Sequence, residues 1–252
     1  MIIFAFIAFV LGCIGASFTH VLASRVYTGI SPFRGRSHCF SCGGELSSKD
    51  LIPLVSFIRS KGRCRMCGTK VSVLHPLIEL MAGLLCMGVY LIHGLSFLTF
   101  FYIIFILLMV FLSVYDIAHT VLPTKPLYAS VLLGFLIALV TPSSLLITLI
   151  GTVCAAGFIY ALHFFSKGKA MGFGDVVLTG ALSLAVGIPA SWIGLVLSFW
   201  IGAVISIAVL YLRFRTVRMG VVVPFGPFLV LGFLFAYVFE GPLVSYITYL
   251  FL

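Results

Sequence analysis

The sequence predicts an all-α polytopic membrane protein with about eight transmembrane helices and a polar cytoplasmic insert after the first span. Hydrophobic residues make up 62% of the 252 residues and charged residues only 8%. The apolar side chains are therefore too many for the core of one soluble domain. These apolar residues form long runs. The positively charged residues lie in every second connection between the runs. Composition, apolar runs and charge placement thus agree on a chain that crosses a bilayer repeatedly.

The first apolar run, from Ile2 to Leu22, has 21 residues, close to the roughly 20 that a spanning helix needs. No basic residue precedes it, whereas a cleaved signal peptide begins with a basic region. We therefore interpret it as a retained span with its N-terminus outside. Seven further runs are predicted as spans: Pro76 to Ile92, Ser96 to Tyr115, Pro126 to Val140, Ser144 to Phe165, Val176 to Gly187, Trp192 to Leu212 and Val221 to Phe239.

Positive charge is confined to one set of connections between these runs. With the N-terminus outside, all fifteen Lys and Arg residues lie on the cytoplasmic side, nine of them between Arg25 and His75. This distribution follows the positive-inside rule, and it accounts for the net charge without a nucleic-acid partner. We predict three parts: a first span in residues 1–24, a cytoplasmic insert in residues 25–75 and a transmembrane domain in residues 76–252.

Two of the three aspartates lie at the ends of predicted spans. Asp116 follows the run that ends at Tyr115, and Asp175 precedes the run that begins at Val176. Both are cytoplasmic in the predicted topology, so packing of the two antiparallel helices would let them meet. Because acids at membrane depth are costly and usually functional, we predict that Asp116 and Asp175 are a catalytic pair.

Each aspartate alone also has an ordinary structural interpretation. Asp175 could cap a helix N-terminus, and Asp116 could be an interfacial residue. Two carboxylates held together, however, cannot both ionise easily, so they share a proton. One neutral acid and one carboxylate can polarise a peptide carbonyl and deprotonate a water, which hydrolyses the bond without a covalent intermediate. The glycines beside Phe173 would let irregular backbone and a substrate strand approach the carboxylate.

Four cysteines of the insert form two C-x-x-C pairs. Cys39 and Cys42 make the first pair, and Cys64 and Cys67 make the second, with 21 residues between the pairs. This spacing is typical of a tetrathiolate zinc site. Two disulfides or four reduced thiols are the alternatives, and the reducing cytoplasm disfavours disulfides. We predict a closed structural zinc site, with His38 as a candidate substitute ligand.

Three further features are interpreted from their positions. Glu79 is close to the cytoplasmic face, where an interfacial acid is the favoured interpretation over substrate positioning. His163 lies inside a span and is interpreted as satisfied or cavity-lining rather than catalytic. Pro227 disfavours helical geometry at Gly226, which suggests a broken or re-entrant entry to the last span.

The residues together resemble the prepilin peptidases, also called type 4 leader peptidases, in five motifs that occur in order along most of the chain. These motifs are Gly15-Ala16-Ser17-Phe18, the cysteine insert from Ser37 through Cys67 with His75-Pro76-Leu77-Ile78-Glu79, Tyr115-Asp116 to Leu122-Pro123, Gly172-Phe173-Gly174-Asp175, and Pro224-Phe225-Gly226-Pro227-Phe228.

The resemblance implies an intramembrane-type aspartic endopeptidase of the bacterial inner membrane, which removes the basic leader from type IV prepilins or pseudopilins at the cytoplasmic face. It gives the catalytic roles to Asp116 and Asp175 and the zinc-ligand roles to the four cysteines of the insert. Many members then methylate the new N-terminal residue with S-adenosylmethionine. No dinucleotide-type glycine loop marks a site for this cofactor, so the methylation follows from the resemblance alone.

The sequence departs from the family pattern at two positions. Thr124 stands where many members have Asp after Leu-Pro, which leaves Asp116 as the acid of that motif. His20 stands where Asn is common. Membrane lipid is the expected partner besides the prepilin substrate.

Two other classes of protein are alternatives. A carboxylate-coupled transporter would need acids near the bilayer centre and an internal repeat, and neither is apparent in the sequence. A non-enzymatic zinc-ribbon membrane scaffold would leave the paired aspartates without a role.

Overall fold

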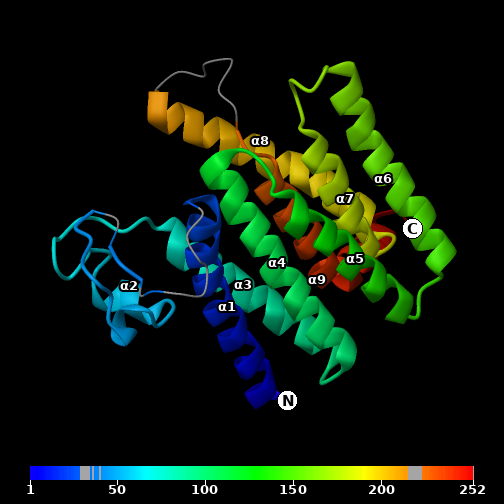
Figure 1. The fold of residues 1–252 in the computed structure, drawn as a ribbon. Helices are drawn as coiled ribbons and strands as arrows, with labels where there is room; N and C mark the ends of the chain where they lie inside the picture. The colour runs from blue at the N-terminus through cyan, green and yellow to red at the C-terminus, as the bar shows by residue number, and fades with distance from the viewer. Residues whose placement is uncertain (29–34, 36, 40, 215–222, 252) are drawn as a thin grey trace. The chain divides into compact units, whose positions relative to one another are not determined.

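The computed structural model describes residues 1–28, 35, 37–39, 41–214 and 223–251 (Figure 1). These described residues form helices and no β-strand, with two isolated β-bridges in the insert, which confirms the predicted all-α fold. The elements are α1 (Ile2–Thr28), η1 (Ser48–Asp50), α2 (Val55–Arg59), α3 (Leu74–His93), α4 (Phe97–His119), α5 (Thr124–Val140), α6 (Leu145–Phe165), α7 (Phe173–Val186), α8 (Ala190–Phe214) and α9 (Gly226–Phe251).

Each of the eight predicted spans corresponds to one apolar helix in the described part of the chain, namely α1 and α3 through α9. Among the described residues, α1, α3, α4, α6 and α8 each contain a stretch long and apolar enough to cross a membrane. The apolar stretches of α5, α7 and α9 are shorter. The chain is thus a multi-pass membrane protein, and a total of eight crossings stays a prediction.

The structure corrects one prediction about the last span. The described apolar stretch of α9 ends at Glu240, next to the predicted end at Phe239, and the helix itself continues to Phe251. The predicted broken entry is wrong, because α9 begins at Gly226 and the Phe225 carbonyl accepts the N–H groups of Phe228 and Leu229 at 3.0 and 3.1 Å. Pro227 therefore lies in the first turn of α9, where its missing N–H would have had no helical partner in any case.

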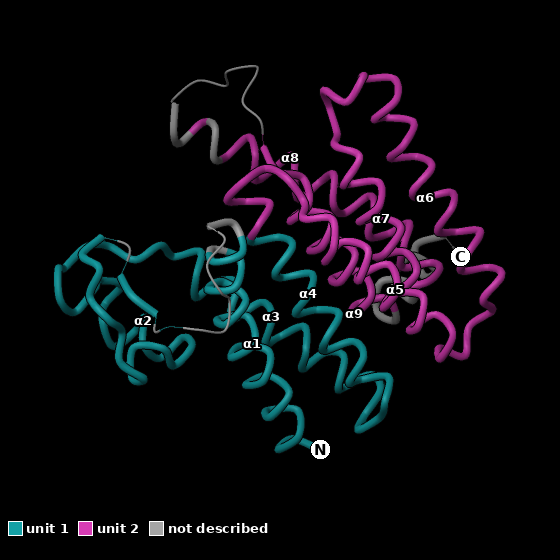
Figure 2. Tube along the Cα trace, in the orientation of Figure 1, with its two compact units in different colours: residues 1–114 teal, residues 115–252 magenta. Residues whose placement is uncertain are grey.

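The chain divides into two compact units, residues 1–114 and residues 115–252 (Figure 2). In the first unit, α1 packs along α3. A Cβ at Gly12 would lie 2.7 Å from the Ala82 carbonyl oxygen, and a Cβ at Gly83 would lie 2.6 Å from the Cys13 sulfur. Small residues therefore let the two backbones approach closely, as is common between membrane helices.

In the second unit, α7 packs against α5, α6 and α9, and α8 packs against α9. Close packing again depends on glycine, because a Cβ at Gly134 on α5 would lie 2.6 Å from the Ala181 carbonyl oxygen of α7. Leu178 and Leu182 of α7 are fully buried. The neighbouring helices thus hold α7 firmly, and residues of its first turn are placed on a rigid support.

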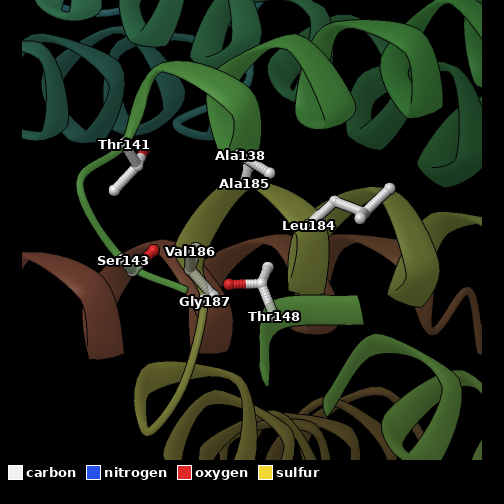
Figure 3. Close-up of a pocket in the computed structure, with 8 residues that line it drawn as sticks. All are labelled: Ala138, Thr141, Ser143, Thr148, Leu184, Ala185, Val186 and Gly187. Atoms are coloured by element: carbon white, nitrogen blue, oxygen red, sulfur yellow. The ribbon is translucent and has the colours of Figure 1, made fainter. Parts of the chain in front are cut away.

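A cavity of about 20 Å³ lies beside the C-terminal end of α7, with Thr141, Thr148, Leu184 and Gly187 among its lining residues (Figure 3). This volume is enough for about one water molecule. Asp175 lies in the first turn of α7, nearly ten residues earlier, which is about 14 Å along the axis at 1.5 Å per residue. The cavity is therefore separate from the region of the aspartates.

Candidate active site and metal centre

Asp116 lies in the last turn of α4, within the second unit, and its side chain is buried. Its Oδ2 atom accepts a hydrogen bond from the N–H of Gly226 at 3.1 Å. Since Gly226 is the first residue of α9, the carboxyl group lies at the positive end of a helix, where unpaired N–H groups bind anions. The tertiary contact joins residues 110 positions apart in the chain.

Gly226 is needed for this contact. A Cβ added there would lie 2.7 Å from Asp116 Oδ2, closer than real Cβ contacts come. Any side chain at this position would therefore push the carboxyl group away from the α9 N-terminus. The motif from Pro224 to Phe228 therefore has a physical role: it lets the N-terminus of α9 bind the Asp116 carboxyl group. The predicted break in the helix did not supply this role.

Asp175 is the third residue of α7 and is also buried. Its Oδ2 atom accepts a hydrogen bond from the N–H of Gly172, the N-cap residue, at 3.1 Å. The Thr179 hydroxyl donates to the main-chain oxygen of Asp175 at 2.7 Å. Asp175 thus does cap a helix, as the structural interpretation expected, but this bond engages only one carboxyl oxygen.

Asp116 and Asp175 are both buried in the second unit, and the charge of Asp175 acts on the Asp116 carboxyl group. The flanking motifs also meet, because a Cβ at Gly174 would lie 3.1 Å from Leu122 Cδ1. A side chain at position 174 would therefore require Leu122 to shift by a few tenths of an ångström. The expected irregular backbone beside Phe173 is present on its N-terminal side, because Gly172 is extended and its N–H reaches the Asp175 carboxyl group, whereas α7 begins at Phe173.

His163 lies near Asp175 in the second unit, although it was interpreted from the sequence as satisfied or cavity-lining and was not assigned to the site. Its Nδ1 atom is 2.8 Å from the Met171 carbonyl oxygen, and its ring meets that of Phe173 at a centroid distance of 6.0 Å. It also interacts electrostatically with Asp175. The signal in the sequence was its place at the end of the span that leads directly into the loop before Asp175.

Glu79 belongs to the first unit and lies near the start of α3, and its place at a membrane interface stays a prediction. Its side chain is buried, and Oε2 accepts a hydrogen bond from the backbone N–H of Leu54 at 2.9 Å. Leu54 has a φ of 61°, in the left-handed region that non-glycine residues rarely adopt. Glu79 therefore ties a strained corner of the insert to α3.

The four predicted zinc ligands lie together in the insert. The sulfur atoms of Cys39, Cys42, Cys64 and Cys67 are all within 4.8 Å of one another, and those of Cys39 and Cys67 are 3.9 Å apart. A tetrahedral zinc ion with bonds of about 2.3 Å separates its sulfurs by about 3.8 Å. The cluster therefore fits a tetrathiolate zinc ion, and His38 is not part of it.

The two C-x-x-C segments are closed by the same kind of backbone hydrogen bond. The N–H of Gly43 donates to the Cys39 carbonyl at 2.8 Å, and the N–H of Gly68 donates to the Cys64 carbonyl at 2.9 Å. The φ angles of these glycines are 69° and 72°, which glycine adopts without strain. The hydroxyl and backbone N–H of Thr69 lower the pKa of the Cys67 thiol to about 6, which favours the thiolate that binds metal.

The chain matches two family models: the bacterial peptidase A24 N-terminal domain over residues 10–93 and the type IV leader peptidase family over residues 103–207. No solved structure matches it.

A prepilin leader peptidase/N-methyltransferase of Bacillus subtilis is 28% identical, over 95% of this chain and 96% of that protein. A type 4 prepilin-like proteins leader peptide-processing enzyme of Escherichia coli is 32% identical, over 82% of this chain and 77% of that protein. A prepilin leader peptidase/N-methyltransferase of Aeromonas salmonicida is 30% identical, over 78% of this chain and 69% of that protein. The chain therefore belongs to the type IV leader peptidase family.

Proposed function

We propose that this chain is an aspartic endopeptidase that removes the leader peptide from type IV prepilins or pseudopilins, with Asp116 and Asp175 as its catalytic pair. The observation that carries the proposal is a pair of buried carboxyl groups, each held by a backbone N–H at the start of a helix, with the charge of Asp175 acting on Asp116. The family and the names of the relatives support the same reaction.

The two carboxyl groups are suited to act as one unit with a shared proton. The described hydrogen bonds engage Oδ2 of each residue, which leaves the Oδ1 atoms for water and substrate. The neutral carboxyl group donates a hydrogen bond to the scissile carbonyl, and the carboxylate takes a proton from the attacking water. The tetrahedral intermediate then releases the amine, which receives a proton from the pair, and both carboxyl groups return to their starting state.

A transporter is less well supported, because Asp116 and Asp175 lie at helix ends rather than in the middle of a span. A scaffold held by zinc alone would not explain why two helices bury acids of which one acts electrostatically on the other. We further propose that the site and the insert face the cytoplasm, at the inner membrane of a bacterium, because every Lys and Arg of the sequence lies on that side in the predicted topology.

Substrate recognition is proposed to depend on the apolar helix of the prepilin rather than on its basic leader. The insert is strongly basic, and Asp50, one of its few acids, is bound to Arg65 at 2.9 Å. Glu79 is buried on α3. Such a surface repels a basic leader and favours anionic lipid, to which each basic group near the membrane adds about 1 kcal/mol.

We therefore expect that neutralising leader charges changes the cleavage rate only a few-fold, whereas polar substitutions in the substrate helix near the cut reduce it strongly. Both substrate series are compared in liposomes, with the inserted amount of each substrate measured and matched. A dominant dependence of the rate on leader charge would show that recognition works differently.

Methylation of the new N-terminal residue by S-adenosylmethionine is proposed as a second activity, because the names of several relatives include an N-methyltransferase. No residues of this chain are assigned to that cofactor. Purified protein incubated with a prepilin and a tritiated methyl donor tests both activities in one reaction. A shortened, labelled product supports both activities, a shortened unlabelled product supports the peptidase alone, and an uncut substrate contradicts the proposed function.

Zinc is proposed to fold the insert and to take no part in hydrolysis. We expect about one zinc ion per chain and a clear loss of zinc in Cys64→Ser, because metal binding supplies folding energy to a segment with little core. Cys154→Ser is the matched control, since Cys154 is exposed on α6 and outside the cluster. Metal analysis and limited proteolysis measure both effects. An ordered insert in metal-free, fully active protein would contradict the proposal.

A further inference from the structure

We propose that His163 is a positioning residue, which orients the carboxyl group of Asp175 through the peptide group between Met171 and Gly172. The inference rests on the proposed function, in which Asp175 is catalytic. His163 is on the last turn of α6, and Asp175 is on the first turn of α7. The two residues therefore stand at opposite ends of the loop that connects these helices.

One peptide group makes both contacts. The Met171 carbonyl oxygen lies 2.8 Å from His163 Nδ1, and the N–H of Gly172 donates to Asp175 Oδ2 at 3.1 Å. A carbonyl oxygen only accepts hydrogen bonds, so Nδ1 carries the hydrogen. The carbonyl of Met171 and the N–H of Gly172 belong to the same planar unit. The imidazole of His163 therefore fixes the orientation of this peptide plane, and the N–H on the opposite side of the plane holds the Asp175 carboxyl group. The two hydrogen bonds of the peptide group also polarise each other.

The rest of the loop is also bound to His163. Its main-chain carbonyl accepts the N–H of Gly168 at 2.9 Å and the hydroxyl of Ser166 at 3.2 Å. The Ser166 oxygen in turn accepts the N–H of Ala170 at 3.2 Å. The backbone carbonyl of His163 thus binds the first residues of the loop. Its side chain binds Met171 at the end of the loop, directly before the N-cap of α7.

The anchor is needed because the backbone at Gly172 is permissive. Glycine allows the backbone many conformations, so an unanchored Met171–Gly172 peptide group can rotate and withdraw its N–H from Asp175. Displacing a reacting group by about 1 Å costs about 10²-fold in rate. The T-shaped contact between the rings of His163 and Phe173 places the imidazole against the same turn.

The test compares three substitutions of His163 in the purified protein, with steady-state cleavage of one prepilin. Asparagine places an N–H donor where Nδ1 stands, whereas glutamine reaches toward the position of Nε2 and alanine has no donor. We expect His163→Ala and His163→Gln to lower kcat about 10- to 100-fold with KM nearly unchanged. We expect His163→Asn to recover a kcat within a few-fold of the unmodified protein.

Phe164→Ala is the matched control, because Phe164 is on the same turn of α6 and is exposed. It should leave kcat unchanged. The inference is overturned if His163→Ala keeps full kcat, or if asparagine and glutamine give equal rates. If the alanine variant does not fold, the comparison of asparagine with glutamine decides. Asp175→Asn, assayed in parallel, separates the two proposals: full activity there would refute the proposed function, whereas its inactivity beside an active His163→Ala would refute only this inference.

Discussion

Replacing either Asp116 or Asp175 with asparagine is expected to lower prepilin cleavage at least about 10³-fold, because residues that act as one catalytic unit each carry nearly the whole effect. Asparagine keeps an oxygen that can accept the N–H of Gly226 or Gly172, so the local fold should survive. It cannot carry the shared proton or the negative charge. Cleavage of purified prepilin measures the loss, and membrane extraction with gel filtration checks that each variant is inserted and folded.

Glu240→Gln is the matched control for these substitutions. It also neutralises an acid in the second unit, but Glu240 is on α9, well after Gly226 at the N-terminus of that helix. We expect it to keep near-normal cleavage. Near-normal cleavage by Asp116→Asn or Asp175→Asn would instead show that the substituted residue is not catalytic.

Gly226→Ala is expected to lower cleavage about 10²-fold, the cost of displacing a reacting group by about 1 Å. The added Cβ would lie 2.7 Å from Asp116 Oδ2, so the carboxyl group must move away from the N-terminus of α9. The substitution alters neither aspartate, and alanine is well tolerated in a helix. Cleavage rate and thermal stability measured on the same preparation separate this local effect from unfolding.

The control is Gly157→Ala on α6, where an added Cβ would meet nothing within 4 Å. This variant should cleave normally. Equal activity of Gly226→Ala and the unmodified protein would mean that the contact between α9 and Asp116 is not needed for catalysis.

The sequence was sufficient to predict the eight apolar helices and the cysteine cluster, because both depend on local pattern. A long run of apolar residues predicts a membrane helix by itself, whatever other segments pack against it. Two C-x-x-C pairs predict a tetrathiolate site because each pair is shaped by local contacts. The N–H groups of Gly43 and Gly68 donate to the carbonyls of Cys39 and Cys64, and both glycines have a positive φ. The position of Asp175 near the start of a span was likewise visible from where the apolar run begins.

Apart from the pairing of Asp116 with Asp175, which their positions at span ends suggested, contacts between distant segments could not be predicted in this way. The bond between Asp116 and Gly226 joins residues 110 positions apart, and nothing in either segment specifies the other. The burial of Glu79 against Leu54 depends on how the insert folds back on α3. The length of α9 could not be predicted either, because Glu240 and Pro242 interrupt the apolar run, whereas the helix continues to Phe251.

The central claim is that Asp116 and Asp175 act as one unit, and the double variant tests it most directly. Single-turnover cleavage is measured for Asp116→Asn, for Asp175→Asn and for the protein that carries both substitutions. The account predicts that all three share nearly the same residual rate, because removing one carboxyl group already abolishes the shared proton. A double variant whose loss is the product of the two single losses would show that the carboxyl groups act independently, and would contradict the proposed mechanism.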